Sequence, residues 1–196
     1  MKKIFSILFI ILVGFNTKIF SEDSTVIKRI SEGVDNAKIT IIAYESLTCG
    51  HCADFHKNVY PDLKKDFINK GLVKIEFRHF PLDVAAFNAS KIGQCNNDGK
   101  SEVLHTLFLG QKRWAKGKSP EEATAYLKKF LTDEGIKVDF DKCLSNKAIE
   151  DFVLNDRIDG VKKFKVNATP TIIINDKKFE KALNYKNIKK YLEKLI

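Results

Sequence analysis

Two cysteines three residues apart are the part of this sequence best suited to chemistry. Cys49 and Cys52 lie in the stretch T-C-G-H-C-A-D-F, which spans Thr48 to Phe55. Such a pair can form a stable crosslink, supply half of a metal site, or exchange its disulfide with another thiol. Each use requires different surroundings, so the elements around the pair must decide between them.

The segments on either side of the pair predict a strand followed by a helix. Ile39 to Tyr44 is rich in β-branched residues and has the length of a buried strand. Cys52 to Lys70 carries apolar residues at every fourth position, which predicts a helix over this range. Cys49 is therefore expected at a helix N-terminus, where unpaired N–H groups and the helix dipole stabilise a thiolate.

This position predicts different roles for the two sulfurs. His51 adds positive charge beside the first sulfur, so Cys49 is expected to be the nucleophile that forms a mixed disulfide. Cys52 lies one turn inside the helix and is expected to be shielded. It would then attack the mixed disulfide and release the partner.

The other uses of the pair are less well supported. A structural zinc site needs a second close pair of ligands, whereas Cys95 and Cys143 are far apart with no ligand beside them. A crosslink between Cys49 and Cys52 would close too short a loop to restrict the unfolded chain. We therefore expect no metal site. Apart from His51, the histidines are interpreted as surface or core polar residues; they are His56, His79 and His105.

The N-terminus predicts export. Lys2 and Lys3 precede a mostly apolar run, Ile4 to Phe15, which is short for a bilayer span and typical of a signal peptide. Cleavage is expected after Ser21, and an uncleaved anchor is the alternative. Outside the cytosol, disulfides form and persist. The formal net charge is +9, but the lysines are spread among acidic residues, so nucleic acid is not an expected partner.

The rest of the chain predicts two short α/β halves around a helical segment. Leu72 to Phe80 alternates as a half-buried strand, parallel to the first because a helix connects them. Helical patterns then continue over about residues 83–165, with one helix marked from Val103 to Trp114 and a later one weakened at Gly160. The chain ends in two strands and a helix. We expect an α/β fold with an all-helical insertion between strand-helix-strand and strand-strand-helix halves.

In this order the segments resemble the DsbA family of thioredoxin-fold thiol-disulfide oxidoreductases, in particular its alpha-proteobacterial branch. The resemblance covers nearly the whole mature chain, residues 22–196 after a signal peptide over residues 1–21. It depends on four stretches: S-L-T-C-G-H-C-A, V-Y-P-D-L-K-K-D-F, F-R-H-F-P-L-D and F-K-V-N-A-T-P-T-I-I-I-N. It implies a cis peptide bond between Thr169 and Pro170 beside the cysteine pair, with the Thr169 backbone free to pair with a substrate strand.

Three further expectations depend on the resemblance. Cys95 and Cys143 are interpreted as a structural disulfide, which similar family members carry; two free thiols are the alternative. The family often has a buried acid where this chain has Ala43, and Glu45, on the same strand face, is the expected replacement. The Gly50-His51 dipeptide resembles that of disulfide isomerases, which predicts an oxidant of intermediate strength.

The function that the resemblance implies is disulfide donation in the periplasm. The Cys49–Cys52 disulfide would pass to unfolded exported proteins with reduced cysteines, without any cofactor. A DsbB-type membrane quinone-linked oxidase would reoxidise the protein, which is expected to be a monomer. The alternatives are a disulfide isomerase or reductase, and a chaperone-like peptide-binding protein whose cysteines are incidental.

Overall fold

The computed structural model describes residues 26–196, so the predicted signal peptide lies outside the described residues. No helix among residues 26–196 combines the length and apolarity that a membrane crossing requires. The strands are β1 (Ser31–Glu32), β2 (Ile39–Glu45), β3 (Val73–His79), β4 (Thr171–Ile174) and β5 (Lys177–Lys178). The helices are α1 (Gly50–Asn58), α2 (Tyr60–Leu63), α3 (Val84–Gln94), α4 (Glu102–Leu109), α5 (Gln111–Trp114), α6 (Pro120–Asp133), α7 (Phe140–Ser145), α8 (Lys147–Phe164) and α9 (Tyr185–Leu192), with a π-helical turn η1 (Lys64–Ile68) after α2.

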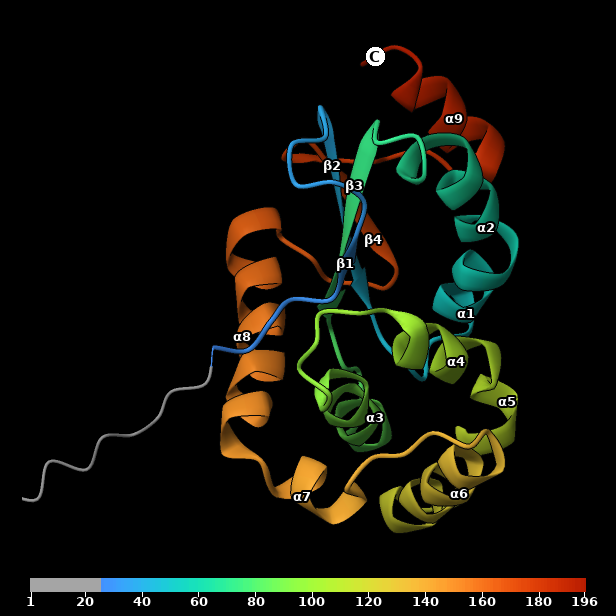
Figure 1. Ribbon diagram of the computed structural model, residues 1–196, viewed down its shortest axis with the longest axis vertical. Helices are drawn as coiled ribbons and strands as arrows, with labels where there is room; N and C mark the ends of the chain where they lie inside the picture. Colours follow the sequence, from blue (N-terminus) through green and yellow to red (C-terminus); the bar gives the residue numbers. More distant parts are fainter. Residues whose placement is uncertain (1–25) are drawn as a thin grey trace, which may run out of the picture.

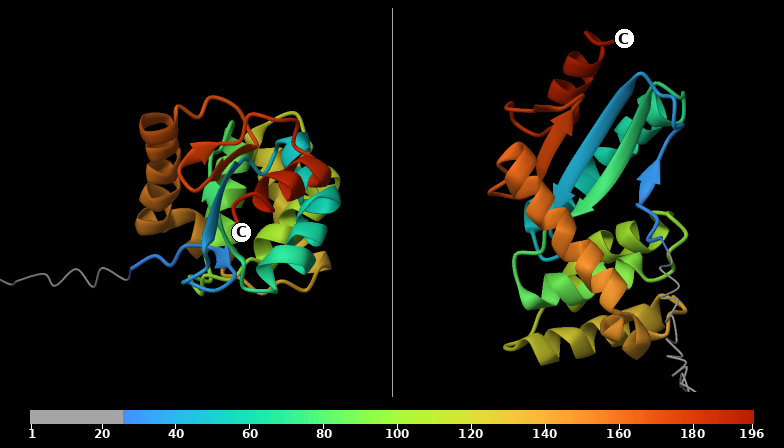
Figure 2. Two further views of the ribbon diagram at one scale, coloured as in Figure 1. Left: turned by 90° about the horizontal axis from the view of Figure 1, so that it is seen from above. Right: turned by 90° about the vertical axis from the view of Figure 1, so that its left-hand side faces the viewer.

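The five strands form one sheet in the order β1-β3-β2-β4-β5. The central strand β2 is parallel to β3, as predicted, and antiparallel to β4. In Figure 1, α1, α2 and α9 lie on one side of the sheet and α8 on the other. Helices α3 to α7 form a separate layer beyond one end of the sheet (Figures 1 and 2). The predicted fold class, two α/β halves around a helical insertion, is confirmed.

Both faces of β2 are buried, and each face has its own core. Ile39, Ile41 and Ala43 belong to the large core between the sheet, α1 and the insertion. Tyr44 belongs to a smaller core beneath α8. Glu45 follows Ala43 by two residues and therefore lies on the α1 side of the sheet.

Cys95 and Cys143 form a disulfide, as predicted. Cys95 follows the last residue of α3 and Cys143 lies in α7, with their Cα atoms 5.5 Å apart. The bond therefore crosslinks two helices within the insertion. It leaves Cys49 and Cys52 as the free thiols among the described residues.

Two predicted helices are interrupted in the structure. The range Cys52 to Lys70 was expected to be one helix, but it contains α1, α2 and η1. Pro61 is in the first turn of α2, where its missing N–H and its ring prevent a continuous helix. The helix marked from Val103 to Trp114 is divided at Gly110, where a Cβ would overlap the Phe130 ring.

Gly160 does not weaken its helix, so this expectation was wrong. Helix α8 continues through Gly160 to Phe164. The glycine is buried, and a Cβ at this position would lie only 2.7 Å from Cε1 of Tyr44. The missing side chain therefore lets α8 pack closely against the Tyr44 ring of β2.

We expect Gly160→Ala to destabilise the protein by about 1–3 kcal/mol, because the new methyl group must displace the Tyr44 ring. Gly93→Ala in α3 is the matched control, because its methyl group would meet Leu104 and Leu107 at 3.7 Å, an ordinary contact. The control is expected to be neutral or stabilising by up to about 1 kcal/mol, since alanine has the higher helix propensity. Urea unfolding measures both variants. Equal changes in the two would contradict this account of Gly160.

Candidate active site

The two cysteines lie at the start of α1, directly after the central strand. Cys49 is the N-cap residue of α1 and is partly buried. Cys52 lies one turn later and is 0% exposed. A substrate thiol can therefore reach the first sulfur, whereas the second is enclosed by the core.

The surroundings shift the pKa values of the two thiols in opposite directions. The hydrogen bond from Cys52 lowers the pKa of Cys49 to about 5, against the opposing effect of burial. Thr169 and the backbone N–H groups of Cys52 and His51 also lower the pKa of Cys49. Burial is the main cause that raises the pKa of Cys52 far above its usual range, and the charge of Glu45 acts in the same direction. At neutral pH, Cys49 is therefore a thiolate and Cys52 a thiol.

The loop before β4 lies against the first sulfur. The peptide bond between Thr169 and Pro170 is cis, and Sγ of Cys49 lies 3.3 Å from the Thr169 carbonyl oxygen. A groove of about 560 Å³ begins at this contact. Its lining includes the exposed His51 side chain together with Asp54, Phe55, Asn58, Val59, Thr169, Pro170, Leu183, Asn184 and Tyr185. The groove therefore lies beside Thr169, whose carbonyl oxygen contacts Sγ of Cys49.

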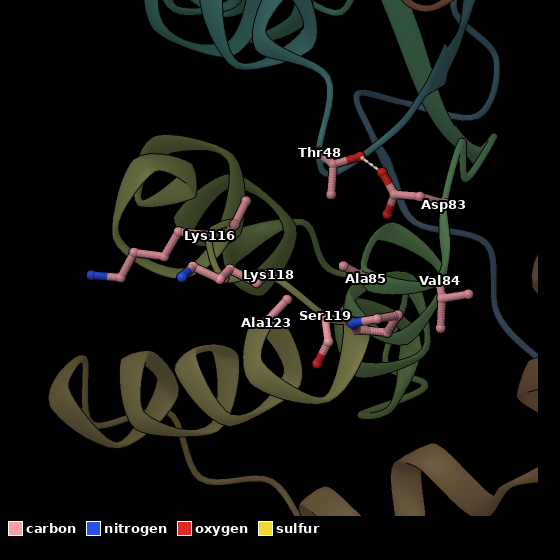
Figure 3. A pocket seen from close by; sticks show the side chains of 11 residues that line it. Thr48, Asp83, Val84, Ala85, Lys116, Lys118, Ser119 and Ala123 are labelled. Carbon is pink, nitrogen blue, oxygen red and sulfur yellow. Dashed lines mark hydrogen bonds between the residues drawn. The ribbon is translucent and has the colours of Figure 1, made fainter.

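Two side chains of the insertion fix the turn that precedes Cys49. The Thr48 hydroxyl donates to Asp83 across 2.7 Å, as Figure 3 shows, and Asp83 also accepts from the Ala86 N–H to cap α3. Gln111 donates from one amide nitrogen to the carbonyls of Leu47 at 2.8 Å and Cys49 at 3.0 Å. The insertion therefore supports Cys49 through the backbone of residues 47–49.

Sequence reasoning did not identify these two supporting residues. Asp83 has a detectable signal, because an aspartate before a helical segment is a common N-cap. Gln111 has none, since a single glutamine in a helical segment does not indicate its partners.

A second cavity, of about 320 Å³, borders Thr48 on the side of the insertion. Lys116, Lys118 and Ser119 are among the residues that line it (Figure 3).

Glu45 is buried on the α1 side of the sheet. One of its oxygens, Oε2, lies 2.9 Å from Nε2 of His56, and the other, Oε1, has no hydrogen-bond partner among the described residues. His56 is a buried polar residue and His105 a half-buried one, and the two rings contact each other. Within residues 26–196, no three His, Cys, Asp or Glu side chains are grouped as metal ligands.

Comparison with known proteins agrees with this geometry. The family model described as thioredoxin matches residues 25–194. The chain belongs to the thioredoxin family. The crystal structure of alpha-DsbA1 from Wolbachia pipientis matches with a TM-score of 0.75 and 29% identity, covering 85% of this chain and 90% of that one. BdbD from Bacillus subtilis matches with a TM-score of 0.67 and 25% identity, covering 85% and 92%. The protein is therefore a DsbA-like member of the thioredoxin family.

Relatives of this thioredoxin-family protein have names that refer to disulfide chemistry. It is 28% identical over 173 residues to disulfide bond formation protein D of Bacillus subtilis, covering 83% of this chain and 74% of that protein. It is 28% identical over 150 residues to a putative protein-disulfide oxidoreductase of Rickettsia bellii, covering 73% of this chain and 55% of that one. The chain thus spans about half the length of the Rickettsia relative.

We expect Gln111→Met to destabilise the protein by about 1–3 kcal/mol, because it removes the Gln111 donor from the Leu47 carbonyl while nearly preserving side-chain volume. The Cys49 carbonyl also loses this donor but keeps the N–H groups of Cys52 and Ala53. Lys112→Met, at the next and exposed position of α5, is the matched control and should change stability by less than about 0.5 kcal/mol. Denaturant unfolding of the oxidised proteins checks both values. If Gln111→Met were as stable as its control, the carbonyl contacts would not support the turn.

Proposed function

We propose that this protein is a periplasmic thiol-disulfide oxidoreductase that donates its Cys49–Cys52 disulfide to exported proteins. The observation that carries the proposal is the contrast between the two thiols, with the pKa of Cys49 lowered to about 5 and that of Cys52 raised. The contrast makes Cys49 the better leaving group and the stable thiolate of the reduced protein. The names of the relatives support the same reaction.

The exchange takes place in two steps. A substrate thiolate attacks Sγ of Cys49, the Cys49–Cys52 bond breaks, and Cys52 leaves with the electron pair and takes up a proton. A second substrate thiolate then attacks the substrate sulfur of the mixed disulfide, and Cys49 leaves as a thiolate. The substrate loses two electrons and gains a disulfide, while the protein gains the two electrons.

Three groups around the cysteines assist these steps. The groove beside Thr169 and Pro170 would bind an extended, unfolded substrate, and the Thr169 backbone would pair with it. The space beside Gly50 is open to a substrate, since nothing lies within 4 Å of a Cβ placed there. Glu45 would exchange the proton of Cys52, in the role expected for the family's buried acid.

Stabilisation of the Cys49 thiolate favours the reduced protein and hence the transfer of the disulfide to substrate. A DsbB-type membrane oxidase linked to quinone would then remove the two electrons, and no cofactor is needed within this monomer. An isomerase or reductase is the alternative, and it would be held mostly reduced in cells. A chaperone-like protein would bind unfolded peptides in the same groove, and its cysteines would take no part.

We expect Cys49→Ser to abolish oxidation of a reduced, unfolded substrate, because no other exposed thiol is present among the described residues. Cys52→Ser, mixed with a substrate that already carries a disulfide, should instead accumulate a mixed disulfide, because the Cys49 thiolate displaces one substrate sulfur and no Cys52 is present to release the other; non-reducing electrophoresis detects it. The Cys95→Ala/Cys143→Ala double variant is the control, and it should remain active at a temperature where it is folded. Full activity of Cys49→Ser would contradict catalysis by thiol exchange through Cys49.

The low pKa of Cys49 predicts how the thiolate absorbance and the stability of the reduced protein change with pH. Absorbance at 240 nm of the reduced protein should titrate with a midpoint near pH 5, the pKa of Cys49. Because this pKa is lower in the folded than in the unfolded protein, the thiolate stabilises the reduced form fully above about pH 8.5. This stabilisation should decrease as the pH falls and disappear below pH 5. Unfolding of oxidised and reduced protein across this range measures the difference, and a constant difference would contradict the assignment.

A further inference from the structure

Four acid and base side chains form a continuous row that leads from Glu45, at the end of β2, to Glu32 in β1. We call Glu45, His56, His105 and Glu32 the relay row. Glu45 Oε2 lies 2.9 Å from His56 Nε2, His56 Nδ1 lies 2.7 Å from His105 Nδ1, and His105 Nε2 lies 2.9 Å from Glu32 Oε1. The four residues belong to β2, α1, α4 and β1. Disulfide exchange as described above uses only the first of them.

The relay row can hold its protons in two ways. Each of its three contacts is short enough to require one shared proton. When every proton lies on the Glu45 side, Glu45 is neutral and Glu32 is ionised; when every proton lies on the Glu32 side, the reverse is true. Both histidines are neutral in either case, since each imidazole carries one proton. The two arrangements have the same charge and the same contacts, so protons can shift along the row without any side chain leaving its place.

Aromatic rings enclose the middle of the row. His56 is 2% exposed and stacks on Phe108, with ring centroids 4.0 Å apart. Tyr60 packs on His105 at 4.3 Å, and Phe77 packs edge-on against the same ring at 5.2 Å. Burial is the main cause that raises the pKa of Tyr60, so its hydroxyl stays neutral beside the row. The rings fix both imidazoles in the orientation that transfer requires.

The far end of the row opens to solvent. Glu32 and His105 line a surface cavity of about 410 Å³ together with Lys64, Ser101 and Glu102. Lys64 Nζ lies 2.6 Å from Glu32 Oε2, and Ser101 donates to Oε1. Burial opposes ionisation of Glu32, but hydrogen bonds from His105, Lys64 and Ser101 hold its pKa well below the usual range. Burial lowers the pKa of His105, which keeps that ring neutral near pH 7 despite Glu32.

The near end of the row faces a sulfur that needs a proton. Cys52 is fully buried, and a substrate in the groove would cover the nearby surface, so its proton cannot come directly from solvent. Glu45 Oε1 is buried and has no partner among the described residues, while the Glu45 charge acts on Cys52. Glu45 Oε1 is therefore not engaged in another hydrogen bond among the described residues.

We propose that the relay row conducts protons between Cys52 and the surface cavity beside Lys64. This inference rests on the proposed exchange reaction. When Cys52 leaves as a thiolate, the row begins with its protons on the Glu32 side and Glu45 ionised. Glu32 passes on a proton taken from solvent, each imidazole accepts a proton on one nitrogen as it releases one from the other, and Glu45 passes the proton it receives to Cys52. The opposite movement removes the proton when Cys52 attacks a mixed disulfide. His56, His105 and Glu32 are thus positioning residues that act through Glu45.

The test is His105→Gln, which retains hydrogen bonding but cannot accept a proton on one nitrogen and release one from the other. His79→Gln is the matched control, because His79 is buried and bonded to Gln94 at 3.2 Å, outside the row. Stopped-flow oxidation of a labelled dithiol peptide gives the rate of Cys52 departure in H2O and D2O. General acid–base catalysis contributes about 10²–10⁴-fold, so we expect His105→Gln to slow this step at least about tenfold and to reduce its solvent isotope effect.

The midpoint of the Cys49 titration should not change in His105→Gln, which separates the relay from activation of the nucleophile. Added imidazole should partly restore the rate of His105→Gly, because the missing ring borders the open cavity. If His105→Gln is unfolded, Glu32→Gln serves as the second variant with the same expected loss. An unchanged rate and isotope effect, or an equal loss in His79→Gln, would overturn the relay. Activity in Cys49→Ser would instead overturn the proposed exchange itself.

Discussion

Cys49 caps α1 and Cys52 lies one turn inside the same helix, so a single helical turn separates a partly buried sulfur from a fully buried one. Free backbone N–H groups and the Cys52 thiol stabilise negative charge on the first sulfur, whereas burial and Glu45 oppose it on the second. The rest of the structure maintains this difference. The sheet presents the helix end, and the Thr169–Pro170 loop closes against the first sulfur.

The helical insertion bonds directly to the segments that carry the cysteines. Asp83 and Gln111 bond to the turn before the nucleophile, and the Cys95–Cys143 disulfide joins two helices behind them. His105 also comes from the insertion and contacts a histidine of α1. The insertion therefore contributes to the site in two places. Asp83 and Gln111 support the turn before Cys49, and His105 contacts His56 of α1.

The position of the buried acid connects these features. An acid at residue 43 would lie beside the same strand face as Glu45, but two residues further from the end of β2. At position 45 the carboxylate reaches His56, in the second turn of α1, and so joins a polar row that extends to Glu32. Buried polar groups are costly unless they are hydrogen-bonded. Glu45 Oε2 and the ring nitrogens of His56 and His105 therefore have partners within the row, and the row ends at Glu32 beside a surface cavity.

The sequence by itself determined the periodic elements: the central strand, the helix that begins at the cysteine pair, the parallel second strand and the helical insertion. It determined the opposite roles expected of Cys49 and Cys52, because a helix N-terminus and one turn of burial are local properties. Only the tertiary structure decided that Gly160 contacts Tyr44, that Gln111 reaches the nucleophile turn, and that His56 meets His105. Periodicity shows which face of an element is buried, but the partners of that face are set by packing between segments distant in the sequence.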